Sequence, residues 1–302
     1  MGQVQRGVIF TFAAYLLWGL FPLFWMFLQH VNSLEILVSR IIWSFFFTTV
    51  FIILIGQRHQ LVSDLKQLWH NKPDLIRLFA ASFFISINWF IYIWAVNNGK
   101  VLETSLGYYI NPLITVMFGV IIFKERLTKS AVIALCIAAI SVIILTISYG
   151  TVPWISLLLA ISFGIYGVLK KKIVLDATRG LAIETLMITP IAILTYIYLW
   201  REGPIAFLQT DVQTTILLMV CGILTAIPLI LFAKGAQSVP LYMMGFIQYF
   251  SPTITFFLGV FYFKETFTHI ELLAFCCIWL AVLVFSLPKV WELRKRKPMH
   301  SH

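Results

Sequence analysis

Hydrophobic positions run in long stretches along this chain, and short polar segments separate them. Ten stretches have roughly the 20 residues that an α-helix needs to cross the hydrocarbon core of a bilayer. They cover residues 7–28, 34–55, 75–97, 102–123, 130–148, 153–169, 181–200, 212–234, 240–263 and 270–287. The pattern predicts an all-α integral membrane protein with ten transmembrane helices. The first stretch lacks a cleavage site and is too long for a signal peptide, so we expect it to be retained.

The second half of the chain repeats the first. PLITVMFGVIIFKE, which begins at Pro112, returns as PTITFFLGVFYFKE, which begins at Pro252. Eight positions are identical at an offset of 140 residues, and Tyr109 returns as Tyr249 at the same offset. Self-similarity at one offset indicates a duplicated unit. We therefore expect two five-helix repeats and a basic cytoplasmic tail, over residues 7–148, 153–287 and 288–302 respectively.

Lysine and arginine predict how the helices are oriented. With the N-terminus inside, 18 of the 22 basic residues fall in inner segments and only Lys100, Arg201 and Lys264 fall in outer ones. Arg40 lies within a stretch. An excess of basic residues marks the cytoplasmic side, so both termini are expected there. Because each repeat has an odd number of spans, the second must be inverted relative to the first. Inverted repeats are typical of carriers that expose a midplane site to each side in turn.

Composition excludes a soluble domain, because 61% of the residues are hydrophobic, 11% are charged and the mean hydropathy is +0.94. The net charge of +10 is spread in short runs between the apolar stretches. We therefore expect contact with membrane lipid and none with nucleic acid. The four cysteines lie within apolar stretches and lack metal-binding spacing. No metal and no cofactor are expected.

Polar and aromatic side chains interrupt the third, fourth and ninth stretches on one helical face. We expect them to line a midplane cavity for a small amphipathic or zwitterionic solute, between helices kinked near Pro112 and Pro252. The alternative, that they form helix-packing seams, stays open. The candidate substrate-binding residues are Asn88, Trp89, Tyr92, Tyr108, Tyr109, Asn111, Gln248 and Tyr249.

A few ionisable residues lie within the stretches or at their starts. An arginine at the centre of a membrane helix costs roughly 2.5–3.5 kcal/mol, so Arg40 should be paired or face water, with Glu35 as one candidate partner. A carboxylate near a helix start is also favoured by the helix dipole alone, and this alternative stays open. The run Lys170–Lys172 is expected to anchor the chain at the cytoplasmic surface. The candidates for coupling or gating are Glu35, Arg40, Glu103 and Glu184.

Motifs for catalysis are missing from the sequence. It contains no HExxH, no GxSxG and no pair of intramembrane aspartates, so we do not expect an enzyme. It also contains no Walker A loop with which to use ATP. Two functions remain: a secondary transporter, and a channel or non-transporting membrane protein that influences drug sensitivity.

Four segments resemble a known family. AAYLLWGLFPLFW at 13–25, EILVSRIIWSF at 35–45, NWFIYIWAVNNGKVLETSLGYYINPL at 88–113 and SFGIYGVLKKK at 162–172 are similar to the RarD branch of the EamA-type transporters, in the drug/metabolite transporter superfamily. The resemblance covers nearly the whole chain. It implies a bacterial inner-membrane carrier that exports or exchanges small metabolites, amino acids or drugs without ATP.

The same resemblance places a central cavity between the two halves. The small multidrug members of the superfamily couple to protons through a glutamate in their first span. This chain has no Asp or Glu from Met1 to Gln29, which excludes that route. A monomer is compatible with the sequence, which leaves the oligomeric state open.

Overall fold

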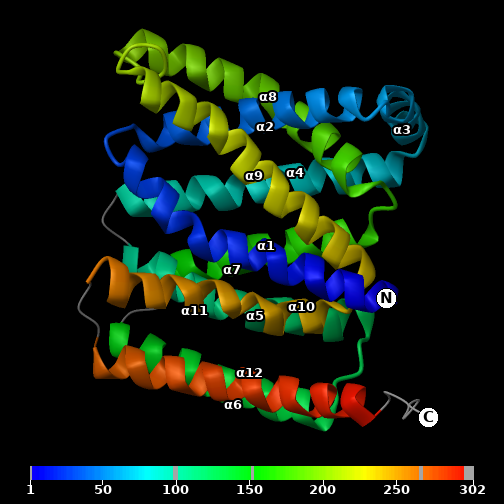
Figure 1. Ribbon diagram of the computed structural model, residues 1–302, viewed down its shortest axis with the longest axis vertical. Helices are drawn as coiled ribbons and strands as arrows, with labels where there is room; N and C mark the ends of the chain where they lie inside the picture. The colour runs from blue at the N-terminus through cyan, green and yellow to red at the C-terminus, as the bar shows by residue number, and fades with distance from the viewer. Residues whose placement is uncertain (1, 98–100, 151–152, 265–267, 296–302) are drawn as a thin grey trace, which may run out of the picture.

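The computed structural model describes residues 2–97, 101–150, 153–264 and 268–295. These residues form helices joined by short connections (Figure 1). The helices are α1 (Gln3–Trp25), α2 (Ser33–Leu54), α3 (Arg58–His70), α4 (Lys72–Asn97), α5 (Val101–Phe123), α6 (Lys129–Tyr149), α7 (Trp154–Lys172), α8 (Ala177–Glu202), α9 (Val212–Ser238), α10 (Leu241–Gln248), α11 (Phe250–Phe257) and α12 (His269–Lys295), with a 3-10 turn at Met26–Leu28 and a π turn at Leu258–Tyr262.

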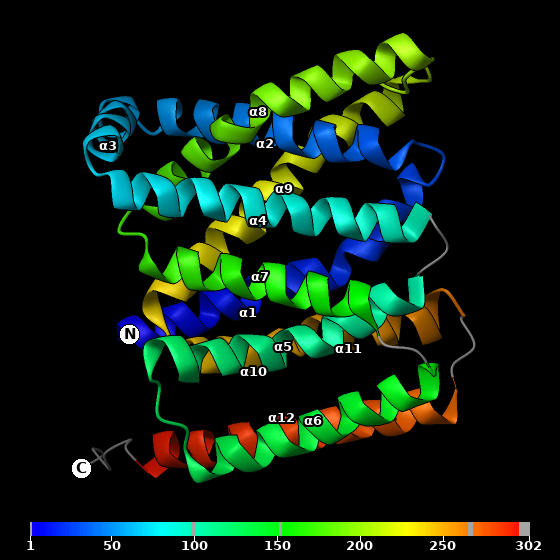
Figure 2. The same cartoon turned by 180° about the vertical axis from the view of Figure 1, so that it is seen from behind.

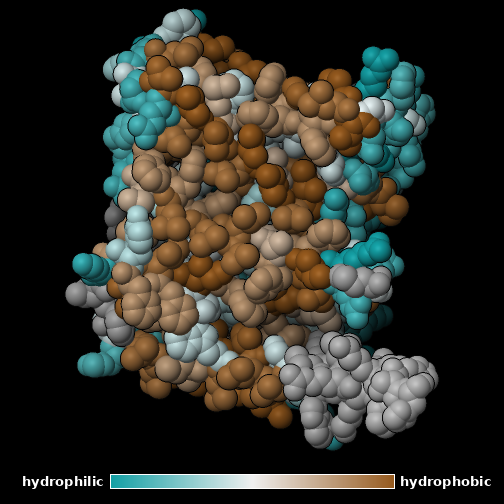
Figure 3. Space-filling view, viewed as in Figure 1, coloured by the Kyte–Doolittle hydropathy of each residue, from teal (hydrophilic) through white to brown (hydrophobic). Residues whose placement is uncertain are grey.

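Ten spans in the described part of the chain are long and apolar enough to cross a membrane. Many large apolar side chains point outward from them, among them Leu54, Ile147 and Leu194. Figure 3 shows this apolar surface filling the middle of one face, with hydrophilic residues gathered towards its two sides. A soluble protein rarely exposes so large an apolar patch, whereas lipid requires one. The chain is a multi-pass membrane protein.

Polar caps stand where several spans begin. The side chains of Asn32, Thr128, Asp176 and Asp211 accept hydrogen bonds from the first backbone N–H groups of α2, α6, α8 and α9. Each cap satisfies a donor that the helix itself leaves unpaired. At the other end of α6, Gly150 adopts the left-handed backbone conformation that ends many helices.

Helix packing in the second half mirrors packing in the first (Figures 1 and 2). Helix α1 packs against α9 as α7 packs against α4, and α5 packs against α7 as α11 packs against α1. Equivalent helices of the two halves also meet directly, in the pairs α2–α8, α6–α12 and α5–α10. Each helix contact thus has a counterpart in which the two halves change places, as expected for two inverted five-helix repeats. The predicted fold class is confirmed.

The duplicated motif also ends with the same backbone in both copies. Lys124 and Lys264, which hold the same place in the two copies, have φ angles of +52° and +55°. A residue other than glycine seldom adopts a positive φ. The local geometry of the turn has therefore been kept along with its sequence.

The ninth span is less regular than the predicted continuous stretch. It consists of α10, an interruption at Tyr249, α11 and the π turn. Pro252 has no N–H to donate to the carbonyl of Gln248, four residues earlier, which accounts for the break at that point. Helix α5, by contrast, continues through Pro112 without interruption.

Both the start of α1 and the end of α12 lie at one end of the bundle, together with α3 (Figure 1). We call this the termini end, and the opposite end the far end. The connection between α1 and α2 and the connection between α8 and α9 lie at the far end (Figure 1).

Candidate solute-binding site

Arg40 lies in the interior of the bundle, where helices α2 and α9 cross closely. A Cβ atom added at Gly222 of α9 would lie 2.5 Å from the Cβ of Trp43 in α2. One turn from this crossing on each helix, the Nε of Arg40 donates a hydrogen bond of 3.0 Å to the hydroxyl of Thr225. Small residues at the crossing thus let the two helices approach and place the guanidinium group inside the protein.

Aromatic side chains surround this guanidinium group. Its carbon lies 5.2 Å from the ring centre of Trp25 in α1 and 4.8 Å from that of Trp89 in α4. Tyr92 of α4 and Tyr108 of α5 are close enough to interact with it electrostatically. Their rings contact each other edge to face, with centres 6.1 Å apart. Four of the five helices of the first repeat therefore contribute to one aromatic site, with Thr225 added from the second.

Part of the surface of these side chains is accessible. Tyr108 is 47% exposed, and Arg40, Trp89 and Tyr92 are partly buried. The packing of the helices therefore leaves the aromatic site accessible.

The other predicted substrate-binding residues lie in helix contacts. Asn88 donates hydrogen bonds to the carbonyl of Leu159 and the hydroxyl of Ser162, at 2.8 and 2.9 Å, and so connects α4 to α7. Tyr109, Gln248 and Tyr249 are buried where α5 meets α10 and α12. Asn111 is also buried, and its side-chain oxygen has no hydrogen-bond partner among the described residues. The adjacent residues Tyr108 and Tyr109 thus face different surroundings.

Within these contacts, polar groups connect the two repeats. The hydroxyl of Thr115 lies 3.3 Å from the Gln248 side-chain oxygen, to which it donates a hydrogen bond. The hydroxyl of Tyr249 lies 3.4 Å from the carbonyl of Tyr109 and donates to it. The ring of Tyr109 contacts Phe275 of α12, with centres 5.2 Å apart.

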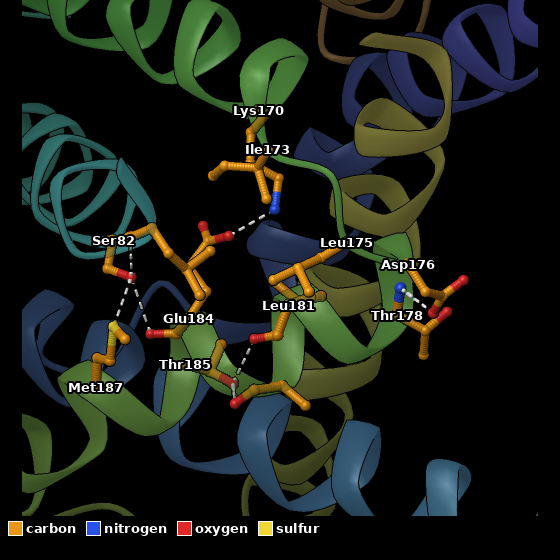
Figure 4. A network of polar contacts seen from close by, with 12 residues as sticks. Ser82, Lys170, Ile173, Leu175, Asp176, Thr178, Leu181, Glu184, Thr185 and Met187 are labelled. Carbon is orange, nitrogen blue, oxygen red and sulfur yellow. Dashed lines mark hydrogen bonds and ion pairs between the residues drawn. The ribbon is translucent and has the colours of Figure 1, made fainter. Parts of the chain in front are cut away.

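Glu184 and Lys170 form a buried ion pair at the termini end of the interior (Figure 4). The Nζ of Lys170 lies 2.7 Å from the Oε2 of Glu184, and both side chains are buried. The hydroxyl of Ser82, on α4, donates to the backbone carbonyl of Glu184. The prediction that Lys170 anchors the chain at the surface was wrong. The prediction that Glu184 lies near the start of its helix, in the stretch 181–200, was also wrong: it lies two turns inside α8, because that helix already begins at Ala177.

Glu35 is held by backbone groups rather than by Arg40. Its two carboxylate oxygens accept hydrogen bonds of 2.8 Å from the N–H groups of Ala206 and Phe207 at the far end. The suggested pairing of Glu35 with Arg40 is therefore wrong. The side chain of Glu103, another candidate for coupling, lies outside the described residues.

Glu125 performs the corresponding role at the termini end. Its carboxylate accepts hydrogen bonds of 2.7 and 2.9 Å from the N–H groups of Leu241 and Tyr242, which begin α10. The Nζ of Lys171 lies 3.6 Å from the same carboxylate. A surface cavity of about 470 Å³ lies beside these groups. It is apart from the aromatic site around Arg40.

Close packing accompanies this polar contact. A Cβ atom at Gly245 of α10 would lie 2.6 Å from a methyl group of Val116 and 2.8 Å from the carbonyl oxygen of Pro112, both on α5. The halves of α5 and α10 towards the termini end are therefore in direct contact. Helix α11, at the far end, packs against α1 instead, where Thr255 donates a hydrogen bond to the carbonyl of Gly19.

Three neighbours of Arg40 and Glu184 did not emerge from the sequence. Trp25 and Lys170 lie within segments that we compared with a family, and Thr225 lies on a span that carries no other signal of a site. The position of Arg40 within an apolar stretch and the aromatic residues Trp89, Tyr92 and Tyr108 were the signals that pointed to this region.

The ten spans and the inverted packing define the class of a membrane transporter, and sequence comparisons agree. Residues 5–147 and 152–287 each match the EamA-like transporter family. The chain belongs to this family.

Two relatives illustrate the match. The chain is 44% identical to "Uncharacterized transporter YojE" of Bacillus subtilis over 96% of its length and 97% of the relative. It is 38% identical to "Protein RarD" of Streptomyces exfoliatus over 94% of its length and 89% of the relative. A solved structure titled "Crystal structure of protein" superposes with a TM-score of 0.70 at 18% identity, over 93% of this chain and 97% of the other. That likeness shows the fold.

Proposed function

We propose that this protein is a secondary transporter that exports or exchanges small metabolites or drugs across the bacterial cytoplasmic membrane. It carries its solute unchanged and uses no ATP. The termini end faces the cytoplasm, because 18 of 22 basic residues belong to the predicted inner segments. The observation that carries the proposal is the inverted packing of two repeats together with a partly accessible aromatic site around Arg40.

The mechanism we propose is alternating access. Residues 7–148 and 153–287 form the two repeats, and residues 288–302 form a cytoplasmic basic tail. The described conformation is closed towards the cytoplasm, where Glu125 joins α5 to α10. Rocking of the repeats about the segments near Pro112 and Pro252 opens this contact and closes the far end.

Counterflow in vesicles tests this function. Lipid vesicles that contain the purified protein are preloaded with one unlabelled solute, and the uptake of the labelled form of that solute is followed. The solutes are amino acids, organic acids and chloramphenicol. Saturable uptake that requires the preloaded solute is expected from a carrier. Flux that neither saturates nor depends on preloading would instead indicate a channel. Folded protein that exchanges no member of the panel would contradict the proposal for those solute classes.

A further inference from the structure

Arg40 makes far fewer hydrogen bonds than its guanidinium group offers. This group has five N–H donors, and the one on Nε is used by Thr225. Among the atoms that the structure describes, which leave out the side chain of Glu103, no acceptor lies in hydrogen-bonding distance of the four donors on the two Nη atoms, and no carboxylate lies within ion-pair distance. The indole rings of Trp25 and Trp89 compensate only part of the charge.

The other ionised groups that the structure describes in the interior are compensated. Lys170 pairs with Glu184, and the carboxylates of Glu35 and Glu125 each accept two backbone N–H groups. A charge enclosed in a membrane protein is costly without such partners. The unused donors of Arg40 therefore point to an anion that is present for only part of the transport cycle.

We infer that Arg40 binds the carboxylate group of the transported solute, which is a small organic acid or an amino acid. This inference rests on the proposed transport function and names the solute class. The two Nη atoms of an arginine match the two oxygens of a carboxylate in a paired, charge-assisted contact. Beside that contact, the apolar part of the solute can pack against the faces and edges of the aromatic rings of Trp89, Tyr92 and Tyr108.

The charge of the site favours a carboxylate over a phosphate. Arg40 is one positive charge, and the ionisable groups that interact with it are the uncharged Tyr92, Tyr108 and Cys221. One carboxylate neutralises that charge. A phosphate monoester with nearly two negative charges would leave an uncompensated negative charge in the membrane interior.

Thermal unfolding of the purified protein in detergent measures this binding. The probes are matched pairs of an acid and its amide, phenylacetate with phenylacetamide and leucine with leucinamide, together with phenyl phosphate and sodium chloride. The variants are Arg40→Gln and Arg40→Lys, and the matched control is Arg201→Gln, at an exposed arginine near the end of α8. Counterflow of the same probes is measured in parallel with the unaltered protein.

At least one acid is expected to raise the unfolding temperature of the unaltered protein and of Arg201→Gln, while its amide does not. In Arg40→Gln the affinity for this acid should fall about tenfold to a hundredfold, the loss expected for charge-assisted hydrogen bonds. Arg40→Lys keeps the charge and loses the paired geometry, so an intermediate affinity is expected. It serves as the test if Arg40→Gln does not fold.

Several results would overturn the inference. These are equal stabilisation by acid and amide, acid binding that survives in Arg40→Gln, or stabilisation by chloride or phenyl phosphate that equals that by the acids. A Glu103→Gln variant that binds the acids although the unaltered protein does not would identify Glu103 as the permanent partner of Arg40, which also contradicts the inference. Failure of the transport function looks different: acids bind through Arg40, but no probe shows counterflow.

Discussion

Among the described residues, Lys170 and Arg40 are basic side chains inside the bundle, and the protein holds them in opposite ways. Lys170 forms an ion pair of 2.7 Å with Glu184, in a region where both side chains are buried. Arg40 contacts one hydroxyl group and two indole rings, and no carboxylate among the described residues lies within ion-pair distance. A permanently paired charge contributes to the folded structure, whereas a charge with free hydrogen-bond donors is suited to a ligand that binds reversibly.

The surroundings of Lys170 and Arg40 also differ, in how closely the neighbouring side chains pack. Ser82, which contacts Glu184, and Trp89, which contacts Arg40, are seven residues apart on α4, or about 10 Å along the helix. Around Lys170 the helices pack closely, while around Arg40 aromatic side chains remain partly accessible. The comparison separates a closely packed region near the termini end from a partly accessible site nearer the far end.

Removing Lys170 should have the largest effect on stability. In Lys170→Met the carboxylate of Glu184 is left buried without its partner, which costs about 3–5 kcal/mol. Unfolding of the purified protein by heat or denaturant measures the loss. The double variant Lys170→Met with Glu184→Leu should regain most of it, because apolar groups then replace both charges. A single variant as stable as the unaltered protein would show that the pair is not structural.

A substitution in the contact between α5 and α10 should have the second largest effect on stability. In Gly245→Ala the new methyl group meets the carbonyl oxygen of Pro112 at 2.8 Å, so we expect a loss of about 1–3 kcal/mol from overpacking. Gly167→Ala is the matched control, because its methyl group would lie 3.5 Å from Phe232, an ordinary contact distance. The unfolding temperatures of the two variants are compared. Equal values would contradict the close packing of α5 on α10.

Glu125→Gln should weaken the same contact without adding bulk. A neutral amide accepts hydrogen bonds from Leu241 and Tyr242 less strongly than a carboxylate, by about 1–2 kcal/mol in total. A cysteine placed at the buried Val116, in a protein whose native cysteines are replaced, should then be labelled about five- to thirtyfold faster by a reagent added on the side of the termini end. Unchanged labelling would remove Glu125 from the closed contact.

Arg40→Gln should have the smallest effect on stability. It removes a charge that lacks a permanent partner, so the free energy of unfolding should change by less than about 1 kcal/mol. Transport of carboxylates should nevertheless fall at least about tenfold. Large destabilisation together with normal transport by the folded fraction would reverse the roles that we assign to Arg40 and Lys170.

Much of the fold could be predicted because the membrane limits the alternatives. Apolar stretches of about 20 residues can only be helices in lipid, and the repeated motif at Pro112 and Pro252 showed two copies with an odd number of spans. The break at Tyr249 was expected only in general terms, as a kink near Pro252.

The polar interior was harder to predict, since it depends on contacts between distant spans. Lys170 belongs to a run of three lysines, and nothing in that run marks the one residue that turns inward to Glu184. Thr225 meets Arg40 across 185 positions. Helical periodicity placed Tyr108 and Tyr109 equally well, and only the packing of α5 against α12 separates them.

The most direct test of the account is counterflow of labelled phenylacetate and leucine into vesicles preloaded with the same compound, compared between the unaltered protein and Arg40→Gln. We predict saturable exchange of at least one of them by the unaltered protein, and a rate at least about tenfold lower in the folded variant. Exchange at equal rates in the two proteins would contradict the role of Arg40. Exchange of the amides in preference to the acids would contradict the solute class.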